Sequence, residues 1–193
     1  MIGRGYAIFD TAIGRCGIAW SHAGVVGVQL PEAREIDTRR RLYGLYPEAR
    51  ELPPPPKVAI AIEAIVAALR GQAGDFSDVT LDVEGISPFN RRVYDYVRAI
   101  PHGETRTCHE VASALRAAGA VHSVAQAIAK NPFMIIVPCH RVLETADSHG
   151  HGRSAFGGTI SKRRLLSIEG VRPTAGKTLF DALLPVVPPR PPA

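Results

Sequence analysis

The stretch NPFMIIVPCHRV, residues 131–142, decides how the second half of this 193-residue chain is organised. Its opening asparagine and proline end a helical pattern, and residues 133–137 then form an apolar run typical of a buried strand. A second proline breaks the run, and Cys139 and His140 follow at once. The sequence therefore predicts a cysteine at the end of a buried segment, beside polar and charged neighbours.

Cys139 is the candidate nucleophile of the chain. The thiolate is the reactive form of cysteine, and the neighbouring His140 and Arg141 can stabilise that form. The alternative is a cysteine that serves as a small buried apolar residue. The chain break at Pro138 and the polar neighbours argue against this alternative.

His140 can act as a base for Cys139 only under certain geometries. Adjacent side chains of a strand point to opposite faces, so either the chain turns at Pro138 or a water joins the two groups. A histidine base also needs an orienting partner. Glu169, at the end of a helix predicted over residues 161–168, is the candidate partner, and an ordinary surface glutamate is the competing interpretation.

Three helices are predicted upstream of the cysteine. An N-cap serine followed by proline begins the first at residue 87, a capping box of Thr107 and Glu110 begins the second, and the third covers residues 121–130. One face of the third helix is polar and presents His122, Ser123, Gln126 and Lys130. Two short helices joined by a glycine-containing turn are typical of a helix-turn-helix, whose second helix meets nucleic acid. A helical hairpin with a solvated face is the alternative.

The first part of the chain predicts a small α+β unit without evident chemistry. Residues 5–30 contain short apolar runs separated by glycines, which indicates antiparallel strands. Residues 57–70 follow a proline and stop at a glycine, as a helix does, and residues 76–83 alternate like a further strand. Trp20 is expected to pack beneath the sheet.

Composition and charge divide the chain into three predicted parts. These are an N-terminal α+β domain over residues 1–83, a basic and mainly helical domain with Cys139 over residues 84–172, and a proline-rich tail over residues 173–193. The middle part holds twelve Lys and Arg against seven Asp and Glu, an excess equal to the whole net charge of +5. This excess favours a polyanionic partner.

No sequence feature indicates a membrane, a metal or a secretory route. No apolar run reaches the ~18 residues of a membrane helix, and the first residues lack the apolar core of a secretory signal. The three cysteines form no CxxC pair. We therefore expect a cytoplasmic protein with reduced thiols, no metal and no membrane partner.

Several segments together resemble a known family. Between residues 87 and 170 the chain reads SPF, RAIPHGETRT, KNPFMIIVPCHRVL, FGG and LLSIEG in that order. This order resembles the methylated-DNA–protein-cysteine methyltransferases, also called 6-O-alkylguanine-DNA alkyltransferases. The Pro-Cys-His-Arg-Val core with Asn-Pro seven residues before its proline is highly specific to this family. The resemblance implies an α+β fold, in which a small N-terminal antiparallel sheet with a helix precedes a mainly helical, winged-helix-like domain with a helix-turn-helix.

The resemblance implies a DNA-repair enzyme that needs no cofactor. Cys139 would take the alkyl group from the 6-oxygen of guanine in DNA, in a single irreversible turnover. His140 would accept the thiol proton through a water, and Glu169 would hold His140 in its tautomer. Asn131 would tie the turn between the two helices to the active-site strand.

The resemblance also implies a substrate pocket and a DNA-binding face. The pocket would comprise Val137, Arg141, Val142, Phe156, Gly157 and Gly158. The DNA-binding residues would be Thr107, Cys108, Val121, His122, Ser123 and Gln126. The implied complex is a monomer on the minor groove of alkylated DNA, with the damaged nucleotide flipped into the pocket.

Two departures from the family pattern concern this face. Cys108 stands where the family usually has a tyrosine that helps to rotate the nucleotide out, and His122 stands where it has an arginine that fills the gap in the stack. The competing function is a protein that binds alkylation-damaged DNA and repairs it weakly or not at all. Non-repairing relatives usually lack the cysteine, which is present here as Cys139. A cysteine hydrolase is a third interpretation, but the chain has no second histidine or asparagine in a recognisable hydrolase context.

Overall fold

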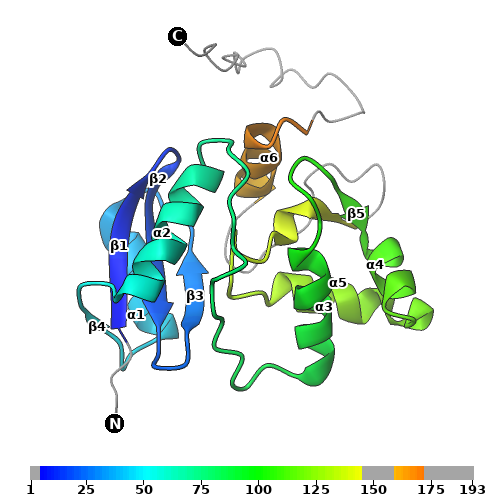
Figure 1. Cartoon of the computed structure of the whole chain (residues 1–193), viewed down its shortest axis with the longest axis horizontal. Helices are drawn as coiled ribbons and strands as arrows, with labels where there is room; N and C mark the ends of the chain where they lie inside the picture. Colours follow the sequence, from blue (N-terminus) through cyan, green and yellow to red (C-terminus); the bar gives the residue numbers. More distant parts are fainter. Residues whose placement is uncertain (1–4, 145–158, 172–193) are drawn as a thin grey trace.

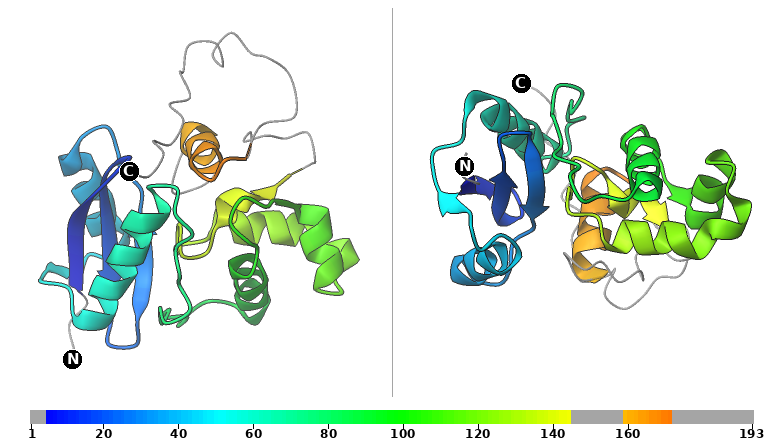
Figure 2. Two further views of the ribbon diagram at one scale, coloured as in Figure 1. Left: turned by 45° about the horizontal axis from the view of Figure 1, so that its top comes forward. Right: turned by 90° about the horizontal axis from the view of Figure 1, so that it is seen from below.

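The structure, a computed structural model of the chain, describes residues 5–144 and 159–171. Two groups of elements lie side by side in Figures 1 and 2: a sheet with its helices from the first half, and a helical group from the second half. The helix α6 (Thr159–Ile168), the last one in the described residues, lies near the seam between the two groups. Within the described residues, no helix is both long and apolar enough to cross a bilayer.

The N-terminal sheet has four strands in the order β3-β2-β1-β4. The strands β1 (Gly5–Thr11), β2 (Gly14–Trp20) and β3 (Val25–Gln29) pair antiparallel, which confirms the strands predicted within residues 5–30. A short edge strand, β4 (Arg50–Glu51), pairs parallel to β1 and was not predicted.

Two helices cover opposite faces of this sheet. The predicted helix is present as α2 (Pro56–Ala68), and it packs with Ile18 and Trp20 in the N-terminal core. The other helix, α1 (Glu35–Leu45), lies against the neighbouring position Gly17, where a β-carbon would overlap Leu42. Because successive strand residues point to opposite faces, α1 and α2 lie on different sides of β2. The sequence did not reveal α1, since most of its side chains are charged or polar.

The strand expected at residues 76–83 is not formed. Only a single bridge pairs Leu81 with Val25, and it is flanked by hydrogen bonds from Val25 N to Thr80 O and from Asp82 N to Val25 O. The Asp82 side chain then accepts hydrogen bonds from Ser21 Oγ and Glu84 N. These local bonds turn the chain away from the sheet, so the alternating pattern was misleading.

The second half contains the predicted helices in short form. The described elements are α3 (Pro88–Arg98), β5 (Arg106–Thr107), α4 (Cys108–Ala114), η1 (Ala118–Ala120), α5 (Val121–Ala129), η2 (Cys139–Arg141), β6 (Val142–Leu143) and α6. Ser87 Oγ caps α3, and the capping box of Thr107 and Glu110 is present at the start of α4. The helix α4 ends before Gly119 because Arg116 takes a left-handed conformation with φ 55°. Strands β5 and β6 pair parallel and tie the start of α4 to the segment after Cys139.

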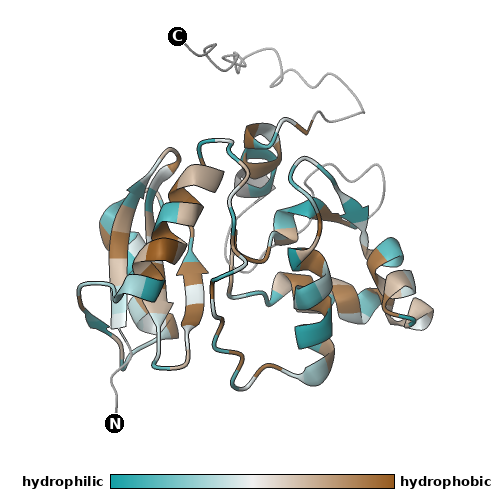
Figure 3. Cartoon of the chain, in the orientation of Figure 1, coloured by the Kyte–Doolittle hydropathy of each residue, from teal (hydrophilic) through white to brown (hydrophobic). Residues whose placement is uncertain are grey.

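Two clusters of buried side chains form the core. One cluster joins α3, α4 and α5 around Val93, Val111, Val124 and Phe133. The other fills the space between the sheet and α2, and it also takes in Met134, Ile135, Ile136, Cys139 and Leu165 from the second half. Figure 3 shows the apolar residues of α2 and β3 on one side of the molecule and those of α3 and α5 on the other. The predicted domain boundary between residues 83 and 84 stays a prediction. Leu81 and Val83, which precede it, pack against the same cluster as the helices that follow it.

Candidate active site

The apolar run at residues 133–137 is buried as expected, but it forms a tight turn and not a strand. Val137 N donates to Phe133 O at 2.8 Å, and Met134 bridges to Val137. Ile135 has φ 73°, a left-handed conformation that is unfavourable for a β-branched residue. The strand interpretation failed because an apolar run alone does not distinguish an extended segment from a buried turn.

Cys139 begins a 3₁₀ turn, η2, immediately after this tight turn. Arg141 N donates to Pro138 O at 2.9 Å, so the chain turns at the proline as the interpretation of His140 required. Successive side chains of a 3₁₀ helix diverge by about 120° and not by the 180° of a strand. Cys139 and His140 therefore both lie in the protein interior, each only 4% exposed.

Glu169 is the hydrogen-bond partner of His140. Its Oε1 lies 2.7 Å from His140 Nε2, and its side chain is 7% exposed, which excludes an ordinary surface glutamate. Arg141 donates to the same carboxylate from Nε at 2.9 Å and 3.1 Å and from a terminal nitrogen at 2.8 Å. The other terminal nitrogen of Arg141 donates to Ile100 O at 2.5 Å. Glu169 thus joins the end of α6 to η2, and Arg141 extends this connection to Ile100, just after α3.

The electrostatics of this group favour a charged carboxylate beside a neutral imidazole. Burial raises the pKa of Glu169, but the hydrogen bonds from His140 and Arg141 outweigh it and lower that pKa to about 2. Burial lowers the pKa of His140 and dominates over the opposing effect of Glu169. A neutral His140 must then donate from Nε2 to the carboxylate, which leaves Nδ1 as the basic nitrogen. His140 Nδ1 is buried and has no hydrogen-bond partner in residues 5–144 and 159–171.

The Cys139 thiol is protonated in these surroundings. Burial raises its pKa, and the opposing effects of the Asn131 side chain and the Lys162 charge are smaller. This corrects the expectation that His140 and Arg141 stabilise a thiolate: His140 is neutral, and Arg141 is engaged with Glu169. The thiol Sγ contacts Met134 Sδ at 3.4 Å.

Asn131 connects the end of α5 to the turn before Cys139. Its Nδ2 donates to Val137 O at 2.9 Å, and its Oδ1 accepts from Phe133 N at 3.0 Å. Asn131 is fully buried, so both bonds are shielded from water.

Lys162 is a buried charge that the sequence analysis counted only as part of the basic excess. It is 9% exposed and donates from Nζ to Val142 O at 2.7 Å. Burial lowers the pKa of Lys162, and the Cys139 and Cys108 thiols partly oppose this effect. A lysine three positions before the apolar pair Leu165 and Leu166 gives no signal of burial, which explains why it was missed.

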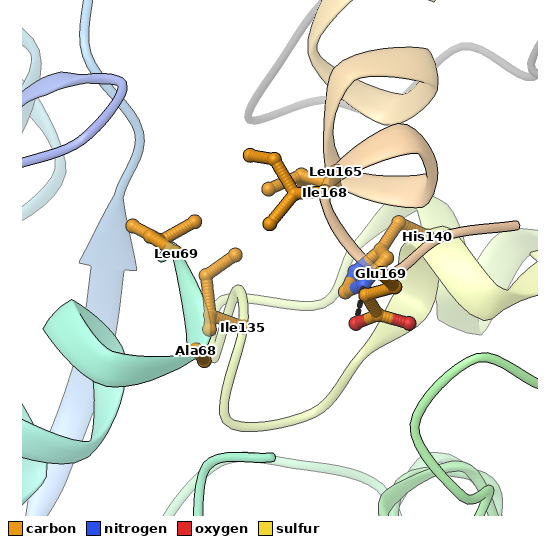
Figure 4. Close-up of a pocket in the computed structure, with 7 residues that line it drawn as sticks. All are labelled: Ala68, Leu69, Ile135, His140, Leu165, Ile168 and Glu169. Carbon is orange, nitrogen blue, oxygen red and sulfur yellow. Dashed lines mark hydrogen bonds and ion pairs between the residues drawn. The ribbon is translucent and has the colours of Figure 1, made fainter. Parts of the chain in front are cut away.

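The predicted pocket residues are only partly in view. Val137 and Val142 are buried and lie on either side of η2. Phe156, Gly157 and Gly158 lie outside the described residues. A small cavity lies on the core side of the His140–Glu169 pair, which we call the relay (Figure 4). It is lined by His140, Glu169, Ile135, Ala68, Leu69, Leu165 and Ile168.

The predicted DNA-binding residues are split between surface and core. His122, Ser123 and Gln126 are exposed on α5, and His122 Nε2 lies 3.0 Å from Gln126 Nε2. Thr107 and Val121 are half-buried. Cys108 is only 4% exposed and packs in the core of the helical group, so its side chain is not part of the surface.

Sequence comparison finds relatives of this chain among known proteins. A family model described as "6-O-methylguanine DNA methyltransferase, DNA binding domain" matches residues 88–171. A methylated-DNA–protein-cysteine methyltransferase from Methanothermobacter thermautotrophicus is 36% identical over 155 residues, which is 80% of this chain and 79% of that protein. The chain belongs to the methylated-DNA–protein-cysteine methyltransferase family.

Solved structures of methyltransferases share the fold. The crystal structure of Mycobacterium tuberculosis O6-methylguanine methyltransferase superimposes with a TM-score of 0.66 and 29% identity, covering 89% of this chain and 96% of that chain. The OGT protein of the same organism in complex with DNA gives a TM-score of 0.63 and 28% identity, covering 85% of this chain and 91% of that one. By its family this chain is a DNA-repair alkyltransferase, and the second of these solved structures contains DNA.

Proposed function

We propose that Cys139 accepts the alkyl group from the 6-oxygen of guanine in DNA, in a single irreversible turnover. One observation carries this assignment: the Cys139 thiol and the His140 imidazole are buried next to each other, and the imidazole is hydrogen-bonded to the Glu169 carboxylate. The Cys139 thiol and the His140 base adjoin in one 3₁₀ turn, and a charged partner fixes the tautomer of that base.

The proposed reaction is an in-line displacement at the alkyl carbon. The bond between that carbon and the guanine 6-oxygen breaks, and a bond to Cys139 Sγ forms. The thiol proton passes through a water to His140 Nδ1, the buried nitrogen that has no partner in the described part of the chain. The leaving guanine keeps the bond electrons and takes up one proton, so no cofactor is consumed.

Other residues of the site support the thiol and the relay. Asn131 holds the turn that precedes Cys139 through its bonds to Val137 and Phe133. Arg141 binds Glu169 and Ile100 O, which keeps the carboxylate in line with His140. The alkyl-bearing base is proposed to lie against the predicted pocket residues, which are Val137, Arg141, Val142 and residues 156–158.

The proposed DNA surface is the exposed face of α5. His122, Ser123 and Gln126 are its exposed polar side chains, with Thr107 and Val121 at its edge. We place this face on the minor groove, with the alkylated nucleotide flipped out of the stack, because the thiol is buried and a stacked base cannot reach it. The burial of Cys108 limits its proposed part to main-chain contacts. A monomer acting in the cytoplasm completes the proposal.

Intact-mass spectrometry tests the acceptor directly. The full chain is incubated with a duplex oligonucleotide carrying 6-O-methylguanine and then digested for peptide mapping. The expected result is a gain of one methylene on the peptide with Cys139, which is lost in Cys139→Ser and kept in Cys16→Ser and Cys108→Ser. A gain on another cysteine would move the site, and binding without any gain would leave a damage-binding protein.

A further inference from the structure

The acceptor sulfur has an unusual neighbour. Cys139 Sγ lies 3.4 Å from Met134 Sδ, and the geometry makes the thiol the donor and the thioether the acceptor. Cys139 is 4% exposed and Met134 is 3% exposed, so water does not compete for this contact. The family resemblance assigned no part to Met134.

The tight turn at residues 133–137 presents Met134 to the thiol. Met134 bridges to Val137, and Val137 N bonds to Phe133 O. This turn requires Ile135 to adopt φ 73°, a strained backbone conformation that persists only where the surrounding structure enforces it. Backbone strain of this kind gathers at functional sites, and here it directly follows the residue that contacts the nucleophile.

We propose that Met134 is a positioning residue that holds the Cys139 hydrogen in the resting protein and keeps the sulfur protonated until alkylated DNA is bound. The proposal rests on Cys139 being the acceptor. A thiol has one hydrogen, and while that hydrogen points at Met134 Sδ it is not directed toward His140. Loss of the proton would leave two electron-rich sulfurs 3.4 Å apart, which disfavours the thiolate.

Such a contact serves a protein that reacts once. Every encounter between a free thiolate and an electrophile in solution would use up one molecule without repairing DNA. A thiol held by Met134 reacts slowly with such electrophiles, and displacement of Met134 or reorientation of the thiol on DNA binding restores the path to His140. The contact therefore favours reaction with DNA over reaction with small alkylating agents.

Several other groups also influence the Cys139 thiol, and their effect is the same in every Met134 variant. Tyr94 on α3 interacts electrostatically with the thiol, and Lys162 on α6 lowers the pKa of the thiol. Asn131 lowers that pKa as well, and His140 follows in the chain. Because these groups are unchanged when Met134 is replaced, a difference between variants reports the Met134 contact.

The chain allows an almost isosteric test, since its two methionines are Met1 and Met134. Protein produced with norleucine has a methylene in place of each methionine sulfur. The rate of Cys139 alkylation by iodoacetamide, without DNA, is measured against pH by peptide mapping. We expect the midpoint of the profile to fall by about half a pH unit and the rate at pH 7 to rise about two- to fivefold, the size of one weak hydrogen bond.

The controls separate the sulfur from packing and from Met1. Met134→Leu keeps an apolar side chain of similar volume without the sulfur, and should reproduce the norleucine profile. Met134→Leu produced with norleucine differs from the same variant produced with methionine only at Met1, so these two should coincide. Thermal unfolding of all four proteins checks that the fold is kept.

The outcomes distinguish this proposal from the proposed function. An unchanged or raised midpoint in both the norleucine protein and Met134→Leu overturns the role of Met134, even if DNA alkylates Cys139. A lowered midpoint supports it. If the midpoint falls but methylated DNA leaves Cys139 unmodified, the Met134 contact stands and the assignment of Cys139 as acceptor fails.

Discussion

Asn131 and Val137 are joined by a hydrogen bond of 2.9 Å from the side-chain Nδ2 to the main-chain carbonyl, and both residues are fully buried. The same side chain accepts from Phe133 N through Oδ1. One amide therefore closes the turn at both ends, two residues before the nucleophile. Without it, Phe133 N would lose its hydrogen-bond partner, and Val137 O would keep only the bond from Cys139 N at 2.7 Å.

Asn131→Ala should lower the free energy of unfolding by about 1–3 kcal/mol, because it leaves the buried Phe133 N–H unsatisfied and removes one of the two hydrogen bonds that Val137 O accepts. The chain offers one matched control, since its other asparagine is the partly exposed Asn90 on α3. Asn90→Ala should change stability little. Urea unfolding of the two variants measures the difference, and equal losses would contradict the proposed part of Asn131.

His140 and Glu169 should behave as one unit in alkyl transfer. His140→Ala, Glu169→Ala and the double variant are expected to show similar losses of rate, because coupled catalytic groups are strongly non-additive. Glu104→Ala, which removes an exposed partner of Arg106, is the matched control and should transfer at the wild-type rate. Single-turnover rates on a 6-O-methylguanine duplex provide the measurement. Losses that multiply in the double variant would show independent roles.

Glu169 should also make stability depend on acid pH. The pKa of its carboxyl falls from 4.5 to about 2 on folding, so its contribution is complete above pH 4.5 and is lost as the pH falls toward 2. Glu169→Gln should therefore be less stable than the wild type by about 2 kcal/mol at pH 7, allowing for partial solvent screening. Urea unfolding at pH 7 and at pH 3 should show this gap narrowing. A gap that is constant with pH would mean that the carboxylate charge is not the cause.

DNA binding should weaken steeply with salt and depend little on sequence. Phosphate neutralisation dominates such binding, and the second half of the chain carries the basic excess. Lys130, exposed after α5, is a candidate phosphate contact, so Lys130→Gln should lower the slope of log K against log salt by about one. Lys57→Gln, on the first turn of α2, is the control. Fluorescence anisotropy at several salt concentrations measures both, and a flat response would argue against an electrostatic interface.

His122→Arg should speed repair of duplex DNA without changing the reaction with a free alkylated base analogue. His122 is exposed and bonds to Gln126 four residues on, whereas an arginine is longer and always charged. It should therefore stabilise the extruded nucleotide better, which matters in duplex DNA and less in single strands. The ratio of duplex to single-strand rates is the measurement, with Ser123→Ala as a control on the same face. A ratio that does not change would make His122 an ordinary surface residue.

The sequence predicted the chemical residues better than the backbone that carries them. Thr107 with Glu110 and Ser87 with Pro88 are local signals, and the helices that they start are present. Glu169 was proposed as the partner of His140 from the need of a histidine base for a carboxylate, and the 2.7 Å contact joins them. These inferences succeeded because they depend on short-range rules or on chemistry.

Other features depend on tertiary contacts that one sequence does not reveal. The turn at residues 133–137 looks like a strand, because the left-handed Ile135 is enforced by packing and not by a glycine. Cys108 was assigned to the DNA surface by resemblance, but the core around α4 buries it. For that reason a tyrosine at position 108 would overpack the core. Unlike His122→Arg, Cys108→Tyr is not expected to speed the repair of duplex DNA.

The shared N-terminal core has a consequence for how the protein is made. Sheet residues such as Ile18 and Trp20 leave the ribosome early, yet their cluster is completed by Met134, Ile136 and Leu165. The first half therefore keeps apolar surface uncovered until almost the whole described chain has been synthesised. A nascent chain stalled before Met134 would expose that surface to chaperones and to other stalled chains, and the nucleophile would become part of a finished core only once α6 has been made.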